Sequence, residues 1–190
     1  MALAGLAVVA GCSHGGSAAI KESQLPTLVL QAADLPRGFT EFDSGKQTRI
    51  DAHPGPREDR GRFGRIEGWK ARYRWGGAPS ARRLLVVESR ADLFDSAGGA
   101  AKDLDAYRDE LEQPAAGSGA RLTKLEPPAL GDDVIAFRSA QGSLVFVTVA
   151  WRRVNATASI LAEGFAGRFE LRDVFTLARR QARRLDGAAG

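Results

Sequence analysis

Few residues in this 190-residue chain could carry out covalent chemistry. It has one cysteine, Cys12, and two histidines, His14 and His53. No Gly-x-Ser-x-Gly nucleophile elbow occurs, and no glycine-rich phosphate loop of the Walker or dinucleotide-binding type is present. A zinc site needs three or four His, Cys or carboxylate ligands, which this inventory does not favour. We therefore predict a protein that is not an enzyme and that binds neither metal nor cofactor.

Carboxylates are the remaining candidates for acid–base chemistry. Asp103, Asp105 and Asp109 fall within one predicted helix, where only Asp105 and Asp109 share a face. Asp132 and Asp133 are adjacent residues of a predicted turn. A glycosidase needs two carboxyl groups that face each other across a cleft. A hydrolase with carboxylates in a cleft is therefore our third hypothesis, after two non-catalytic ones.

The single cysteine follows an apolar segment. Residues 2–10 are apolar throughout, which is about the length of a signal-peptide core and about half of a bilayer span. The residues after Cys12 are mostly small or polar, which predicts a flexible tether over 12–25. A signal peptide normally opens with Lys or Arg, and none precedes Lys21. We therefore expect in-frame basic residues upstream of Met1 in the gene.

Val9-Ala10-Gly11-Cys12 resembles the lipobox of bacterial lipoproteins. The resemblance implies that the Cys12 thiol receives a diacylglyceryl group and that residues 1–11 are cleaved off as a signal peptide. Two acyl chains, such as palmitate, give stable anchoring, whereas one chain binds a membrane only marginally. The resemblance thus implies an exported protein of the cell envelope. Lipid would hold it at the extracytoplasmic face of the cell membrane, away from nucleic acid.

One predicted strand carries a row of aromatic residues. Trp69, Tyr73 and Trp75 alternate with basic residues, which gives the strand an aromatic face and a basic face. Large aromatics on one face are usually part of a core. They could equally line a pocket for a small apolar ligand between the sheet and a helix. These three residues are therefore our candidates for a ligand pocket.

A second candidate surface lies near the C-terminus, where Arg179, Arg180, Arg183 and Arg184 crowd one predicted helix. Cations toward the end of a helix favour its macrodipole, and Glu170 stands at the opposite end. The alternative is an anionic partner, such as lipid headgroups, a wall polymer or an acidic protein. The net charge of +4 is spread along the chain, unlike a nucleic-acid-binding patch.

The predicted elements follow the order β-β-α-β-β-β-β-α. Because the strands outnumber the helices and are joined mostly by hairpins, we predict an α+β fold. It comprises an antiparallel sheet of about five to six strands with two main helices packed on one face. The expected strands cover 69–75, 84–87, 121–125, 134–137, 144–151 and 156–162, and the helices cover 28–33, 91–112 and the residues after 170.

One domain is expected over 26–187. Residues from about 43 to 65 lack periodicity and contain His53-Pro54-Gly55-Pro56, which favours a mobile loop. Residues 121–125 precede Pro127-Pro128, so we predict that they form an edge strand. No second apolar segment is long enough to span a bilayer.

Three short segments, at 33–39, 130–133 and 149–152, resemble exported lipoproteins of high-GC Gram-positive bacteria. The order of strands and helices also loosely resembles the PsbP-like sandwich. The first resemblance implies an envelope protein and the second a non-catalytic binding or assembly module. Both are architectural, so neither carries site residues to this chain.

Two non-catalytic functions follow. The first is a ligand-binding module of the envelope, and the alternative is a module for protein–protein docking or assembly. A continuous cavity beneath the aromatic strand would favour the first. A filled core with an exposed apolar patch would favour the second.

Overall fold

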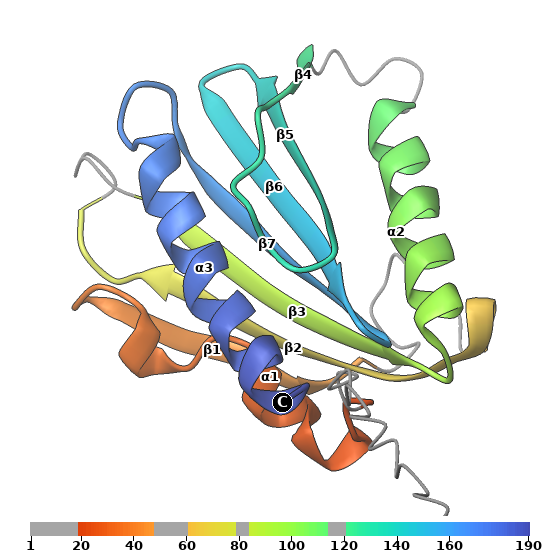
Figure 1. The fold of residues 1–190 in the computed structure, drawn as a ribbon. Coiled ribbons are helices and arrows are strands. Elements are labelled where there is room, and N and C mark those ends of the chain that lie inside the picture. Colours follow the sequence, from red (N-terminus) through yellow and green to blue (C-terminus); the bar gives the residue numbers. More distant parts are fainter. Residues whose placement is uncertain (1–18, 48–60, 79–83, 114–120) are drawn as a thin grey trace, which may run out of the picture.

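The computed structural model of the chain describes residues 19–47, 61–78, 84–113 and 121–190. These residues form one antiparallel sheet of seven strands in the order β1-β2-β3-β7-β6-β5-β4 (Figure 1). The strands are β1 (Phe39–Lys46), β2 (Arg65–Trp75), β3 (Val86–Phe94), β4 (Arg121–Lys124), β5 (Asp133–Gln141), β6 (Leu144–Arg153) and β7 (Ala156–Phe165). The helices are α1 (Leu25–Leu28), α2 (Ala97–Glu112) and α3 (Leu171–Ala188).

The predicted α+β class and antiparallel sheet are confirmed, but the described sheet has seven strands rather than five to six. The additional strand is β1, whose residues from Asp43 onward were expected in a loop. Most β1 side chains are exposed, and a bulge between Glu41 and Asp43 breaks the period of two. The pattern that identifies a strand is therefore missing there. Residues 48–60, with His53, lie outside the described residues.

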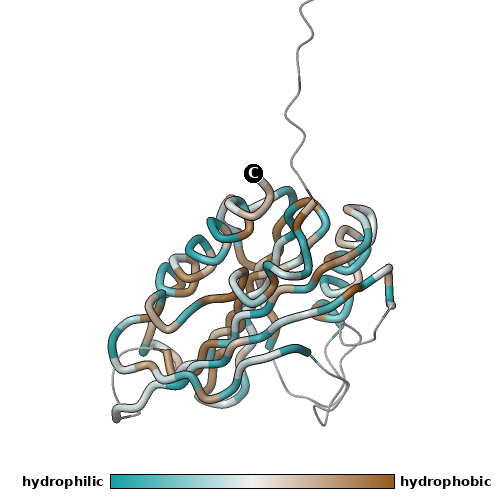
Figure 2. The backbone as a smooth tube through the Cα atoms, turned by 90° about the horizontal axis from the view of Figure 1, so that it is seen from below, coloured by the Kyte–Doolittle hydropathy of each residue, from teal (hydrophilic) through white to brown (hydrophobic). Residues whose placement is uncertain are grey.

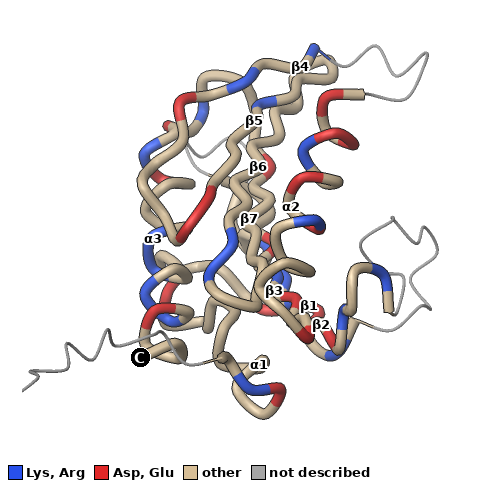
Figure 3. The backbone as a smooth tube through the Cα atoms, turned by 45° about the vertical axis from the view of Figure 1, so that its right-hand side comes forward, with Lys and Arg blue, Asp and Glu red and all other residues tan. Residues whose placement is uncertain are grey.

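The two long helices cover opposite faces of the sheet, so the prediction that both pack on one face is wrong (Figure 3). Val149 of β6 belongs to the same core cluster as Leu177 of α3. Its neighbour Ala150 belongs to a second cluster with Leu104 of α2. Adjacent strand residues point to opposite faces. Because β6 is apolar on both sides, each face can bury a helix.

Strand β3 is longer than expected and runs to Phe94, so the helix predicted from residue 91 begins only at Ala97. The Ser96 hydroxyl caps this helix and accepts a hydrogen bond from the Gly99 amide at 3.1 Å. The apolar residues 91, 93 and 94 fit both a strand and a helix. Strand β4 lies at the sheet edge, which confirms the predicted edge strand.

The N-terminal segment belongs to the domain from Ile20 onward, although residues up to 25 were expected in the tether. It contains α1 and two 3₁₀ turns, Glu22–Gln24 and Ala32–Asp34, in place of the predicted helix over 28–33. Asn155 fastens its start, since it accepts from the Ile20 amide at 2.8 Å and donates to the Ile20 carbonyl at 3.2 Å. Its buried apolar side chains are irregularly spaced, so no helical period revealed them.

Hydrophobic residues follow the central strands and the inner side of α3 (Figure 2). Within the described ranges, no helix is both long and apolar enough to cross a bilayer. The predicted signal peptide and the lipidation site Cys12 lie outside these ranges.

Candidate functional site

The aromatic strand is β2, and its three candidate residues alternate along the strand on one sheet face. Tyr73, in the middle, is 1% exposed. Its hydroxyl lies 2.8 Å from the Leu30 carbonyl and 3.1 Å from the Glu41 carboxylate. Burial raises the pKa of the Tyr73 phenol, and Glu41 acts in the same direction. The N-terminal segment therefore fills the space over Tyr73, and the expected ligand pocket does not lie there.

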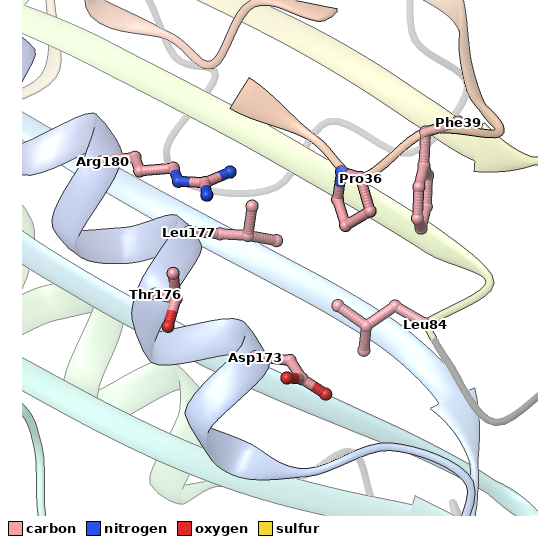
Figure 4. Close-up of a pocket in the computed structure, with 7 residues that line it drawn as sticks. All are labelled: Pro36, Phe39, Leu84, Asp173, Thr176, Leu177 and Arg180. Carbon is pink, nitrogen blue, oxygen red and sulfur yellow. The ribbon is translucent and has the colours of Figure 1, made fainter. Parts of the chain in front are cut away.

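A groove instead opens beside α3, at the Trp75 end of the aromatic row (Figure 4). We call it the α3 groove, and its volume is about 300 Å³. One wall comes from α3 and the other from residues next to β1 and β3. The lining residues are Pro36, Phe39, Leu84, Asp173, Thr176, Leu177 and Arg180.

Helix geometry explains the α3 wall. Residues 173, 176, 177 and 180 are spaced so that they follow one side of the helix. Asp173 helps to begin the helix, because one of its carboxylate oxygens accepts from the Glu170 amide at 3.2 Å. Leu177 is 4% exposed and forms an apolar floor between the polar ends.

The opposite wall is apolar and is supported from behind. Phe39 begins β1, and its ring is tilted against that of Trp75 with centroids 5.9 Å apart. Trp75 thus supports the groove without lining it. Trp69, at the other end of the aromatic row, lines a separate hollow. None of the three aromatic candidates therefore lines the α3 groove.

The structure divides the arginine cluster of α3 into two pairs. Arg184 donates to the Asp34 carboxylate through Nε at 3.1 Å and Nη2 at 2.6 Å. Arg180 donates through Nη1 to the Asp34 carbonyl oxygen. These two residues fasten the N-terminal segment to α3, whereas Arg179 and Arg183 point to solvent.

Arg180 is one of the four arginines predicted to suit an anionic partner, and of these four it is the one that lines the α3 groove. It is half-buried, and the part of the chain that the structure describes offers it no carboxylate partner. The carboxylate of Asp34 is already held by Arg184. The guanidinium at the end of the α3 groove therefore forms no ion pair with a carboxylate of the described ranges.

The hollow beside Trp69 contains two carboxylates and one ammonium group. Lys46 Nζ lies 3.2 Å from Glu67 and 3.8 Å from Glu22. The ammonium group of Lys46 therefore forms ion pairs with both carboxylates of this hollow. Among the described residues, no three potential metal ligands cluster.

The turn carboxylates hold a hairpin together. Asp132 accepts from the Val154 amide at 2.9 Å and from Arg153 at 2.9 Å. Burial acts to raise the pKa of Asp132, but these hydrogen bonds and the charges of Arg153 and Arg152 outweigh it and lower the pKa. Asp133 binds Arg108 at 3.3 Å. Both carboxylates therefore have structural partners.

A pH-dependent loss of stability is expected from Asp132→Asn. A carboxylate with a lowered pKa stabilises the fold above its unfolded value of 3.8, and this contribution disappears as pH falls through the folded value. At pH 7 the variant should unfold at lower urea concentration than the parent. This difference should shrink below about pH 4. The exposed Asp109→Asn is the control, and an equal gap at pH 7 and pH 3 would contradict the assignment.

Comparisons with known proteins give a fold but no family. No protein-family model and no curated protein sequence matches the chain. A solved structure of similar fold is the extracellular domain of PknH from Mycobacterium tuberculosis, with a TM-score of 0.67 and 11% sequence identity. The alignment covers 90% of this chain and 100% of that one. This likeness shows a fold used by an extracellular domain of a high-GC bacterium, and it assigns no residue a function.

Proposed function

We propose that the protein is an exported, lipid-anchored module of the cell envelope that binds a small ligand in the α3 groove. The lipobox-like Val9-Ala10-Gly11-Cys12 supports the anchor. The likeness to an extracellular domain supports a place outside the cell membrane. The groove supports the binding function.

One observation carries this proposal: the α3 groove joins an apolar floor to a few polar groups. Leu84, Phe39 and Leu177 supply the apolar surface, and Arg180 and Thr176 supply polar atoms. Small-molecule sites combine these features, with volumes from about 300 Å³ upward. The groove lies at the lower end of that range, so the ligand is small.

Docking to another envelope component is the second candidate. Phe42 is 40% exposed, and the guanidinium carbons of Arg72 and Arg74 lie 5.1 Å and 5.7 Å from its ring centre. Arg179 and Arg183 are also exposed on α3. These groups would suit an anionic partner. The ligand-binding function is favoured because the groove is a hollow, whereas these groups lie on open surface.

The test is native mass spectrometry of the Cys12→Ser chain after incubation with a membrane extract of a high-GC Gram-positive host. We expect a bound mass that disappears on denaturation and that is absent from Cys12→Ser/Leu177→Trp, because the indole would fill the groove. Cys12→Ser/Arg179→Gln, altered outside the groove, should retain the mass. The parent chain should take up a clickable fatty acid in cells, and Cys12→Ser should not.

The outcomes separate the parts of the proposal. Repeated spectra without a bound mass would contradict ligand binding and favour docking. A bound mass that survives Leu177→Trp would place the ligand outside the α3 groove. Unlabelled parent chain would contradict the lipid anchor alone.

A further inference from the structure

We propose that the ligand of the α3 groove is a small organic carboxylate whose acid group binds Arg180 and whose apolar body lies along Leu177. This inference rests on the proposed function, because it takes the groove to be the ligand site. It adds the chemical class of the ligand and its orientation.

The positive charge of Arg180 indicates that the ligand is negatively charged. A guanidinium has five N–H donors, and the described part of the chain uses Nη1 for a single neutral acceptor, the Asp34 carbonyl. The remaining donors can form the paired hydrogen bonds that a carboxylate accepts. Because Arg180 is half-buried, such a pair is less screened than one in open solvent.

The shape of the groove decides the size and polarity of the rest of the ligand. A volume of about 300 Å³ lies at the lower end of the range for small-molecule sites, so it suits a ligand smaller than a typical drug. Leu177 lies beside Arg180 on α3, and Leu84 and Phe39 line the opposite wall (Figure 4). An apolar chain or ring would therefore lose contact with water against these three side chains.

Asp173 sets the orientation. It lies seven residues before Arg180 on α3, which is about 10 Å along the helix axis. A carboxylate at Arg180 is thus farther from Asp173 than the screening length of about 8 Å at physiological ionic strength. The same acid group at the Asp173 end would meet a like charge. The ligand is therefore held with its acid group at Arg180.

The experiment compares octanoate with octylamine, which have similar chains and opposite charge, by calorimetric titration into the Cys12→Ser chain. We expect octanoate to bind at least about tenfold more tightly, since hydrogen bonds between charged groups are strong. Adding Arg180→Gln should weaken octanoate binding at least about tenfold and remove the preference for the acid. Adding Leu177→Trp should abolish binding of both probes.

Two matched variants separate a binding role of Arg180 from a structural one. Arg184→Gln removes the ion pair with Asp34 but lies outside the groove, so it should loosen the N-terminal segment and keep the preference for octanoate. Arg179→Gln removes a neighbouring charge that points to solvent and should change nothing.

Three results would overturn the inference: octylamine binding as well as octanoate, no measurable octanoate binding, or octanoate affinity that is unchanged in Arg180→Gln. None of these results would by itself contradict the proposed ligand-binding function. If Leu177→Trp still abolished capture of the mass from the membrane extract, the groove would remain a ligand site for another chemical class.

Discussion

Replacing Asp92 by asparagine is expected to lower the free energy of unfolding by about 3–5 kcal/mol, because it would remove the charge of a buried carboxylate that two buried guanidinium groups contact. Asp92 lies in β3, and its side chain is 1% exposed. Arg65 Nη2 approaches it to 2.6 Å, and Arg90 Nε also lies at 2.6 Å. Asparagine keeps the shape of the carboxylate but not its charge.

Asp92, Arg65 and Arg90 form a buried cluster, and water cannot reach it to solvate the two arginines after the substitution. Asp92 pairs in register with Thr157 of β7, whose hydroxyl donates to Asp103 of α2 at 2.9 Å. The cluster is therefore enclosed between the sheet and α2. Gly68 completes the packing, because a Cβ there would lie 2.1 Å from Arg65 Nη2 and 2.4 Å from the Asp92 carboxylate.

Urea unfolding at pH 7 measures this effect. Asp105→Asn is the control, since Asp105 forms an exposed ion pair with Arg108 at 2.6 Å and should change stability by only about 0.5 kcal/mol. A loss below about 1 kcal/mol in Asp92→Asn would show that the two arginines do not depend on this carboxylate. Because α2 and α3 lie on opposite faces, octanoate binding by the folded variant should be retained.

Gly131→Ala is expected to destabilise the protein by about 2–5 kcal/mol, from backbone strain and overpacking together. Gly131 has a φ of +53°, in the left-handed region that side chains disfavour. A Cβ at this position would lie 2.1 Å from the carbonyl oxygen of Arg152. That oxygen accepts from the Asp132 amide at 2.9 Å, so it cannot move without breaking a hydrogen bond.

Gly142→Ala separates the two causes. Gly142 has a similar φ of +60°, but a Cβ there would have no neighbour within 4 Å. Gly142→Ala should therefore lower the free energy of unfolding by about 1 kcal/mol, from backbone strain alone. Thermal and urea unfolding of both variants should rank Gly131→Ala as clearly less stable. Equal losses of stability in the two variants would mean that the backbone around Arg152 can shift to make room for the Cβ without destabilising the protein.

The residues 130–133 show how much a short sequence can reveal. A turn was predicted from Gly131 and the two aspartates, and the structure bends at Gly131 and Asp132, whereas Asp133 already begins β5. The sequence did not show why each residue is needed. Leu130 is buried, Gly131 passes close to Arg152, and Asp132 binds the next hairpin. These contacts join segments about 20 residues apart, so local pattern cannot specify them.

The amino-acid sequence by itself determined the α+β class, the antiparallel sheet, the amphipathic α3 and the edge position of β4. Each depends on a local pattern: the period of two or 3.6, or a proline that ends pairing. It did not determine β1, because an exposed and bulged strand has no clear period. Nor did it determine which face each helix covers, since β6 is apolar on both sides.

The candidate site was decided only by the tertiary structure. The α3 groove is assembled from residues 36–39, from Leu84 and from residues 173–180, which no sequence spacing connects. The sequence drew attention to Arg180 as one of four similar arginines. Folding gave it a distinct role, because Asp34 is paired by Arg184 and leaves the charge of Arg180 free to meet a ligand. Charge neutralisation depends on distances of a few ångströms, and only the packed chain fixes them.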